Sequence, residues 1–110
     1  MSKNRRRDWR FTQIKTSQEL AEEGTKMHHC VYAYQQLCID GRASIWSLKV
    51  RPTSRNDSGP WDRALTVEMN NERRRLVQLR GYANRPMNAD ERQVVSMWAS
   101  ENGLSVSYSG

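Results

Sequence analysis

The chain has 110 residues, 36% of them hydrophobic, and its 18 Lys and Arg residues exceed its 12 Asp and Glu residues to give a net charge of +6. This length accommodates one small domain and leaves little room for a second. No run of about 18 apolar residues occurs, and the charged start MSKNRRRDW has no apolar stretch behind it, so neither a membrane span nor a signal peptide is predicted and a cytoplasmic protein is expected.

The N-terminal part combines a basic segment with a strand and a helix. Residues 1–8 are predicted to form a flexible basic arm and residues 9–110 a single domain that opens with the strand WRFTQIK. Thr16 and Glu19 have the spacing of a capping box, which predicts a short helix over TSQELAEEG that ends at Gly24. A second helix is expected from about Thr25 to Gly41 because it has one apolar stripe, consisting of Met27, Cys30, Val31, Tyr34 and Cys38.

The second half of the chain alternates apolar and polar residues. Residues 44–50, 63–69 and 75–82 each show this period of two, which predicts a three-stranded antiparallel meander. Asn88 and Glu91 have cap spacing for a last helix, and residues 104–108 resemble a short final strand. The expected fold class is therefore α+β, a small domain in which the meander and short terminal strands pack against two or three helices.

Alternation also assigns the two faces of the meander. The apolar set is expected to point toward the helices and consists of Trp46, Leu48, Val50, Leu65, Val67, Met69, Val77 and Leu79. The opposite face then carries a polar row made of Ser47, Lys49, Thr66, Glu68, Gln78, Arg80 and Tyr82. This row is either an ordinary solvated surface with a Glu68–Arg80 ion pair or the floor of a binding site.

Both histidines and both cysteines lie between Met27 and Cys38. Cys30 is on the predicted apolar stripe, which favours burial, but a position in the first helical turn would favour its thiolate. His29, Cys30 and Glu68 are therefore the candidate catalytic residues. Consecutive helical residues radiate about 100° apart, so His28, His29 and Cys30 are not expected to converge on a metal ion. No cofactor is predicted.

The basic residues include two arginine clusters. They are Arg5, Arg6 and Arg7 in the arm and Arg73, Arg74 and Arg75 in the turn before the third strand of the meander. Arginine binds phosphates and stacks on bases, so a nucleic-acid partner is one expectation, and a solvated arginine-rich surface is the alternative.

The order of motifs resembles the PcfJ-like family, which is named for a protein of conjugative plasmids and also occurs in phage and bacterial genomes. The resemblance covers residues 17–104 and includes the segments ELAEEGTKMHHCVYAY, GRASIWSL, ALTVEM and LVQLRGYANRP. The family pattern falls on His29, Cys30, Val31, Tyr34, Thr66, Glu68, Gln78, Arg80, Gly81 and Asn84. Several of these residues belong to the polar row, so the resemblance implies that function lies on that face.

Taken together, these features predict a nucleic-acid-associated accessory module of a mobile genetic element. Its binding residues are expected to be Gln78, Arg80, Tyr82, Asn84 and Arg85 together with the two arginine clusters. Two alternatives remain open. One is an enzyme, either a Cys30-dependent hydrolase or a metal-independent nuclease that uses His29 and Glu68. The other is a phage-encoded inhibitor module that binds a host protein.

Overall fold

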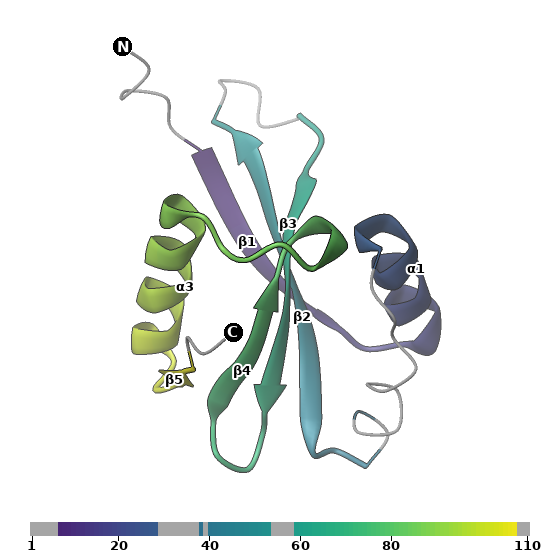
Figure 1. Cartoon of the computed structure of the whole chain (residues 1–110), viewed down its shortest axis with the longest axis vertical. Helices are drawn as coiled ribbons and strands as arrows, with labels where there is room; N and C mark the ends of the chain where they lie inside the picture. The colour runs from purple at the N-terminus through teal and green to yellow at the C-terminus, as the bar shows by residue number, and fades with distance from the viewer. Residues whose placement is uncertain (1–6, 29–37, 39, 54–58, 108–110) are drawn as a thin grey trace.

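A computed structural model describes residues 7–28, 38, 40–53 and 59–107. Five strands form one sheet in sequence order: β1 (Arg7–Ile14), β2 (Ala43–Pro52), β3 (Asp62–Asn70), β4 (Arg75–Arg80) and β5 (Ser105–Val106). The first four strands are antiparallel neighbours and β5 is parallel to β4 (Figure 1). This arrangement confirms the α+β class and shows that the predicted meander is extended by a strand on each side. Arg7 and Asp8, which were expected in the arm, are the first residues of β1.

Helix α1 (Ser17–Met27) begins at the predicted capping box. The Glu19 N–H donates to Thr16 Oγ1 at 3.0 Å, and the Thr16 N–H donates to Glu19 Oε1 at 3.1 Å. The prediction that Gly24 ends this helix is wrong. The helix continues to Met27, and His28 ends it in the left-handed conformation (φ 56°) with its N–H donated to the Gly24 carbonyl.

Most of the predicted second helix, residues 29–37 and 39, falls outside the described residues. Thr25 and Met27, which were expected to begin it, belong to α1. Met27 is buried because it completes the inward stripe of α1, which also contains Leu20, Glu23 and Gly24. His29, Cys30 and residues 31–37 lie outside the part of the chain that the structure describes.

The last helix, α3 (Ala89–Glu101), also begins at its predicted capping box. The Glu91 N–H donates to Asn88 Oδ1 at 2.8 Å, and the Asn88 N–H donates to Glu91 Oε1 at 3.0 Å. After the helix Gly103 has a φ of 65°, in agreement with its predicted role as a stop. Within the described residues no helix is long and apolar enough to cross a membrane.

Helix α3 packs on the apolar face of the sheet and forms the main core. Val95 and Ala99 of α3 are buried against Leu48, Leu65, Val67, Leu76 and Leu79. On the same face Trp98 stacks on Phe11 with ring centroids 4.1 Å apart and meets Trp46 edge-on at 5.2 Å. Each of the buried Leu and Val side chains contributes about 1.5–3 kcal/mol. This layer therefore provides most of the hydrophobic stabilisation.

Two features of the sheet differ from the prediction. A register shift between Glu68 and Met69 pairs Met69 with Leu76, so Leu76 is fully buried in the core in place of the predicted Val77. One extra residue in a strand changes which side chains face inward. The alternation of apolar and polar residues in the sequence therefore no longer predicts the inward face beyond such a bulge. The second difference concerns the described helices: α3 covers the apolar face, whereas α1 packs on the opposite, polar face (Figure 1).

Candidate functional site

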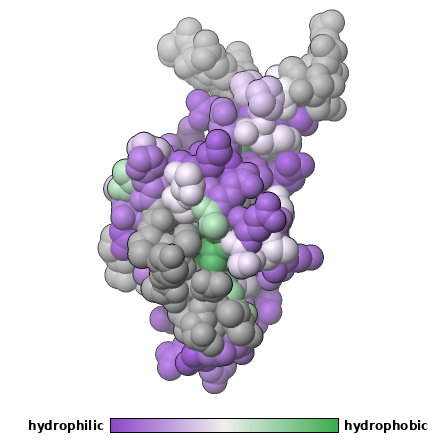
Figure 2. Space-filling view, turned by 90° about the vertical axis from the view of Figure 1, so that its right-hand side faces the viewer, coloured by the Kyte–Doolittle hydropathy of each residue, from purple (hydrophilic) through white to green (hydrophobic). Residues whose placement is uncertain are grey.

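Helix α1 is held on the polar face of the sheet by a buried carboxylate. Thr66 Oγ1 of β3 donates to Glu23 Oε2 at 2.6 Å, and Arg63 Nε donates to Glu23 Oε1 at 2.9 Å. Since Thr66 lies in β3, the central strand of the five, α1 leaves polar residues of β4 on one side and polar residues of β1 and β2 on the other. The side of the molecule where α1 lies is mainly hydrophilic, with a small hydrophobic area (Figure 2).

The β4 side of this face contains the predicted polar row. Thr66 is the register partner of Arg80, and Glu68 is the register partner of Gln78, so these residues share the face opposite Leu65 and Val67. Arg80 Nε donates to Gln78 Oε1 at 3.2 Å. Among the described residues no ion pair joins Glu68 to Arg80, so Gln78 orients the guanidinium and its charge has no carboxylate partner there.

Glu68, a member of this row, lies near Cys38, and both residues are partly buried. Burial raises the pKa of the Glu68 carboxyl, and burial followed by the nearby Glu68 charge raises the pKa of the Cys38 thiol. Cys38 is a free cysteine, and at neutral pH it is protonated rather than a thiolate nucleophile. Both side chains therefore hold their protons more tightly than usual.

The raised pKa of Glu68 predicts a pH-dependent effect of its removal. A carboxyl whose pKa is higher in the folded protein stabilises the fold while it is protonated, and this contribution is lost as pH rises through the raised pKa. Glu68→Gln should therefore gain stability relative to the wild type as pH increases from about 4 toward 7. Denaturant unfolding of both proteins at several pH values measures this difference, with Glu101→Gln on an exposed helical site as the control. A difference independent of pH would contradict the prediction.

The loop after β4 brings Tyr82 and Asn84 to the end of α1. The short helix η2 (Tyr82–Asn84) contains two residues with positive φ, Ala83 at 52° and Asn84 at 65°. Tyr82 is 53% exposed, and its ring centroid lies 4.7 Å from that of His28 at the C-cap of α1. An exposed aromatic ring therefore adjoins the polar row. The expectation that His29 joins the same pocket concerns a residue outside the described part of the chain.

Arg85, which was expected among the binding residues, is engaged inside the fold. Its Nη1 and Nη2 donate to the two carboxylate oxygens of Glu91 at 2.8 Å each, and Nη2 also donates to the Ala64 carbonyl at 3.2 Å. The hydrogen bonds and charge of Glu91 raise the pKa of Arg85, so the guanidinium remains charged. Glu91 is buried, and the pair ties the loop after β4 to the start of α3. Arg85 therefore has a structural role, while 42% of its side chain remains exposed.

The described members of the two arginine clusters lie at opposite ends of the sheet. Arg7 begins β1 next to the end of β2 and lies 3.8 Å from Asp90, while Arg5 and Arg6 are outside the described residues. At the other end, Arg74 Nη2 donates to the Asn102 carbonyl at 2.5 Å, and Arg75 Nε donates to Ser105 Oγ at 3.3 Å. Arg73 is exposed in the same turn. Arg7 therefore does not share one continuous surface with Arg73, Arg74 and Arg75.

A third group of cations, on the β1 side of the polar face, was not predicted. The guanidinium carbons of Arg10 and Arg51 lie 4.4 and 4.3 Å from the centre of the Trp61 ring. Arg51 Nε also donates to Asp8 Oδ2 at 3.2 Å. Arg10 is exposed and has no ion pair within the described residues. We call Arg10, Arg51 and Trp61 the arginine–tryptophan cluster.

Comparison with known proteins identifies the family of this chain. The family model described as PcfJ-like protein matches residues 5–95, which include the polar row and the arginine–tryptophan cluster. The chain belongs to the PcfJ-like protein family. No curated protein and no solved structure matches it. The resemblance read from the sequence motifs is thereby confirmed.

Part of the site in this PcfJ-like domain had a signal in the sequence. Trp9 and Phe11 pack toward the core, so alternation along β1 places Arg10 on the polar face beside Lys49, its register partner. Trp61 had no such signal because it lies outside the segments that alternate apolar and polar residues. Among the described residues no group of three or more His, Cys, Asp or Glu side chains is arranged to hold a metal ion.

Proposed function

We propose that this PcfJ-like domain binds nucleic acid as an accessory module of a mobile genetic element, and that it does so through the polar face of its sheet. The arginine–tryptophan cluster carries this proposal. Two guanidinium groups are stacked on one indole ring, and Arg10 faces solvent without a carboxylate partner among the described residues. Such a group neutralises phosphates at little entropic cost because the ring already orients it.

The β4 side of the same face supports the proposal with groups suited to bases. Tyr82 exposes its ring for stacking, and Arg80 is oriented by Gln78 without an ion pair to Glu68. Aromatic stacking and arginine contacts are the usual means by which proteins hold single strands. In this proposal a strand passes over α1, with its phosphates near Arg10 on the β1 side and its bases near Tyr82 on the β4 side.

Salt dependence and single-arginine variants test the proposed interface. Affinity for a short labelled oligonucleotide should fall steeply as salt rises from about 50 to 200 mM, because phosphate contacts release counterions. Arg10→Ala should weaken binding and reduce the salt slope by about 0.7–0.9, the amount expected for one lost phosphate contact. Arg80→Ala should weaken binding as well. Fluorescence anisotropy over a salt series measures both effects.

Arg42→Ala is the matched control because it removes the same charge from a residue paired with Asp40 at the other end of β2. Its binding should stay close to that of the wild type. No binding of single- or double-stranded oligonucleotide at low salt would overturn the proposal. Equal losses in Arg10→Ala and Arg42→Ala would show only nonspecific attraction by net charge, and that result would remove the cluster from the interface.

A further inference from the structure

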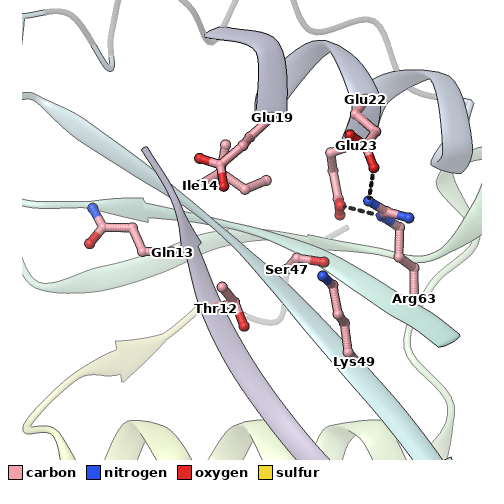
Figure 3. Close-up of a pocket in the computed structure, with 9 residues that line it drawn as sticks. All are labelled: Thr12, Gln13, Ile14, Glu19, Glu22, Glu23, Ser47, Lys49 and Arg63. Atoms are coloured by element: carbon pink, nitrogen blue, oxygen red, sulfur yellow. Dashed lines mark hydrogen bonds and ion pairs between the residues drawn. The ribbon is translucent and has the colours of Figure 1, made fainter. Parts of the chain in front are cut away.

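A small polar pocket lies between α1 and the first two strands, next to the arginine–tryptophan cluster. Its volume is about 120 Å³, and residues of β1, β2, β3 and α1 line it (Figure 3). This is smaller than the cavity of about 150 Å³ that accommodates benzene in another protein, so the pocket has room for a molecule of a few heavy atoms. Its floor is the sheet, and its opposite wall is the helix.

Ser47 gives the pocket an unsatisfied buried hydroxyl. The residue is 2% exposed, and its Oγ has no hydrogen-bond partner within the described part of the chain. Leaving a buried polar group without a partner costs about 1–3 kcal/mol, so native proteins rarely retain one that nothing binds. In Figure 3 the hydroxyl points into the pocket toward the ammonium of Lys49.

The sheet floor offers several donors in one place. Lys49 is two residues after Ser47 on β2 and has no ion pair among the described residues. Thr12 is the register partner of Ser47 on β1 and lines the same pocket. An ammonium with two hydroxyls is a suitable donor set for a carboxylate.

The helix wall offers acceptors of opposite charge. Glu19 uses Oε1 for the cap of α1, and Glu22 uses Oε1 for Arg63. In the described contacts their second oxygens remain available at the pocket. The lining holds three carboxylates, Glu19, Glu22 and Glu23, against two cations, Lys49 and Arg63, so its net charge is −1 and a phosphate dianion is disfavoured.

We propose that this pocket binds a small zwitterion of the size of a short α-amino acid. The ligand carboxylate accepts hydrogen bonds from Lys49 and Ser47, and the ligand ammonium faces Glu19 and Glu22. A zwitterion has a negative group for Lys49 on the sheet and a positive group for Glu19 and Glu22 on the helix. Its carboxylate also supplies the hydrogen-bond acceptor that the Ser47 hydroxyl lacks. This site is independent of the proposed nucleic-acid interface, because a buried hydroxyl does not contact a strand that lies on the surface.

Titration of the ¹⁵N-labelled protein with glycine and with L-alanine tests the proposal. The amide signals of Thr12, Ser47 and Lys49 should shift saturably with either amino acid, and acetate or methylammonium should bind at least tenfold more weakly. Ser47→Ala and Lys49→Met should each reduce the affinity for glycine about tenfold, the effect of losing a hydrogen bond to a charged group. Lys26→Met, on the exposed side of α1, is the control and should bind as the wild type does.

Absence of saturable shifts in the wild type would overturn the proposal and leave the pocket as a water site. Unchanged glycine affinity in Ser47→Ala or in Lys49→Met would do the same. Ser47→Ala should keep both its fold and its oligonucleotide binding, because it removes a hydroxyl without a partner. The two proposals therefore fail separately: loss of oligonucleotide binding in the wild type concerns the interface, and loss of glycine binding concerns the pocket.

Discussion

Glu23→Ala is expected to lower the free energy of unfolding by about 3–5 kcal/mol, the usual cost of removing one partner from a buried ion pair. The Glu23 carboxylate is buried and accepts hydrogen bonds from Arg63 and Thr66. Its loss leaves the buried Thr66 hydroxyl without this acceptor and the mostly buried Arg63 guanidinium with Glu22 alone. Because Glu23 joins the middle of α1 to β3, the helix should also pack less tightly on the polar face. Denaturant unfolding followed by circular dichroism measures the loss.

Glu22→Ala is the matched control for this prediction. Glu22 also contacts Arg63, at 3.2 Å, but its side chain is 57% exposed, so its removal should cost less than about 1 kcal/mol. Glu23→Gln keeps the size of the side chain and one carbonyl acceptor, and it should be intermediate. Similar losses in Glu22→Ala and Glu23→Ala would show that burial does not distinguish the two ion pairs, which contradicts the prediction.

The position of Glu23 explains why the placement of α1 was missed. The inward stripe of this helix consists of Leu20, Glu23, Gly24 and Met27, and a carboxylate in the middle of such a stripe indicates a polar surface beneath it. The sequence therefore contained a sign that α1 does not join the apolar core. The partners of that carboxylate, Arg63 and Thr66, are 40 and 43 residues away, and no local spacing rule relates them to the helix.

Sequence patterns predicted the structure correctly where the interaction joins residues that are close in the sequence. Both capping boxes formed as predicted, because each involves only hydrogen bonds between residues three apart. Gly24 failed as a stop because a left-handed end is only a preference for glycine, and His28 adopts it instead. Val77 failed as a core residue because the bulge between Glu68 and Met69 depends on how the whole sheet is packed.

The part of the polar row on β3 and β4 was predictable because its residues pair in regular register up to the bulge. Alternation along β3 and β4 places Thr66 opposite Arg80 and Glu68 opposite Gln78. The roles of the arginines were less predictable. Arg85 and Arg80 are both arginines of the LVQLRGYANRP segment, but one binds a buried carboxylate and the other donates to the Gln78 amide oxygen. That difference depends on Glu91, which α3 brings into contact.

Arg85→Ala is expected to destabilise the domain by about 2–3 kcal/mol. The change removes the two hydrogen bonds from the Arg85 guanidinium to the buried Glu91 carboxylate. The hydrogen bond from the Asn88 N–H to Glu91 remains. The Arg85 side chain is 42% exposed, so water can partly replace it, and the expected cost lies below that of a fully buried pair. Unfolding by denaturant measures the change. Under conditions in which the wild type and Arg85→Ala are both folded, the two proteins should bind the oligonucleotide with similar affinity.

Gly81→Ala should act through the same ion pair, because a Cβ at residue 81 would lie 2.4 Å from Arg85 Cζ and 2.7 Å from its Cγ. The arginine must then move away from Glu91, and the cost should be similar to that of Arg85→Ala. In the Arg85→Ala background the clash is absent, so Gly81→Ala should cost less than about 1 kcal/mol, a strong departure from additivity. Gly59→Ala, where a Cβ meets nothing within 4 Å, is the matched control. Additive losses of stability in the double variant would show that Gly81→Ala destabilises the backbone at residue 81 and does not act by displacing Arg85.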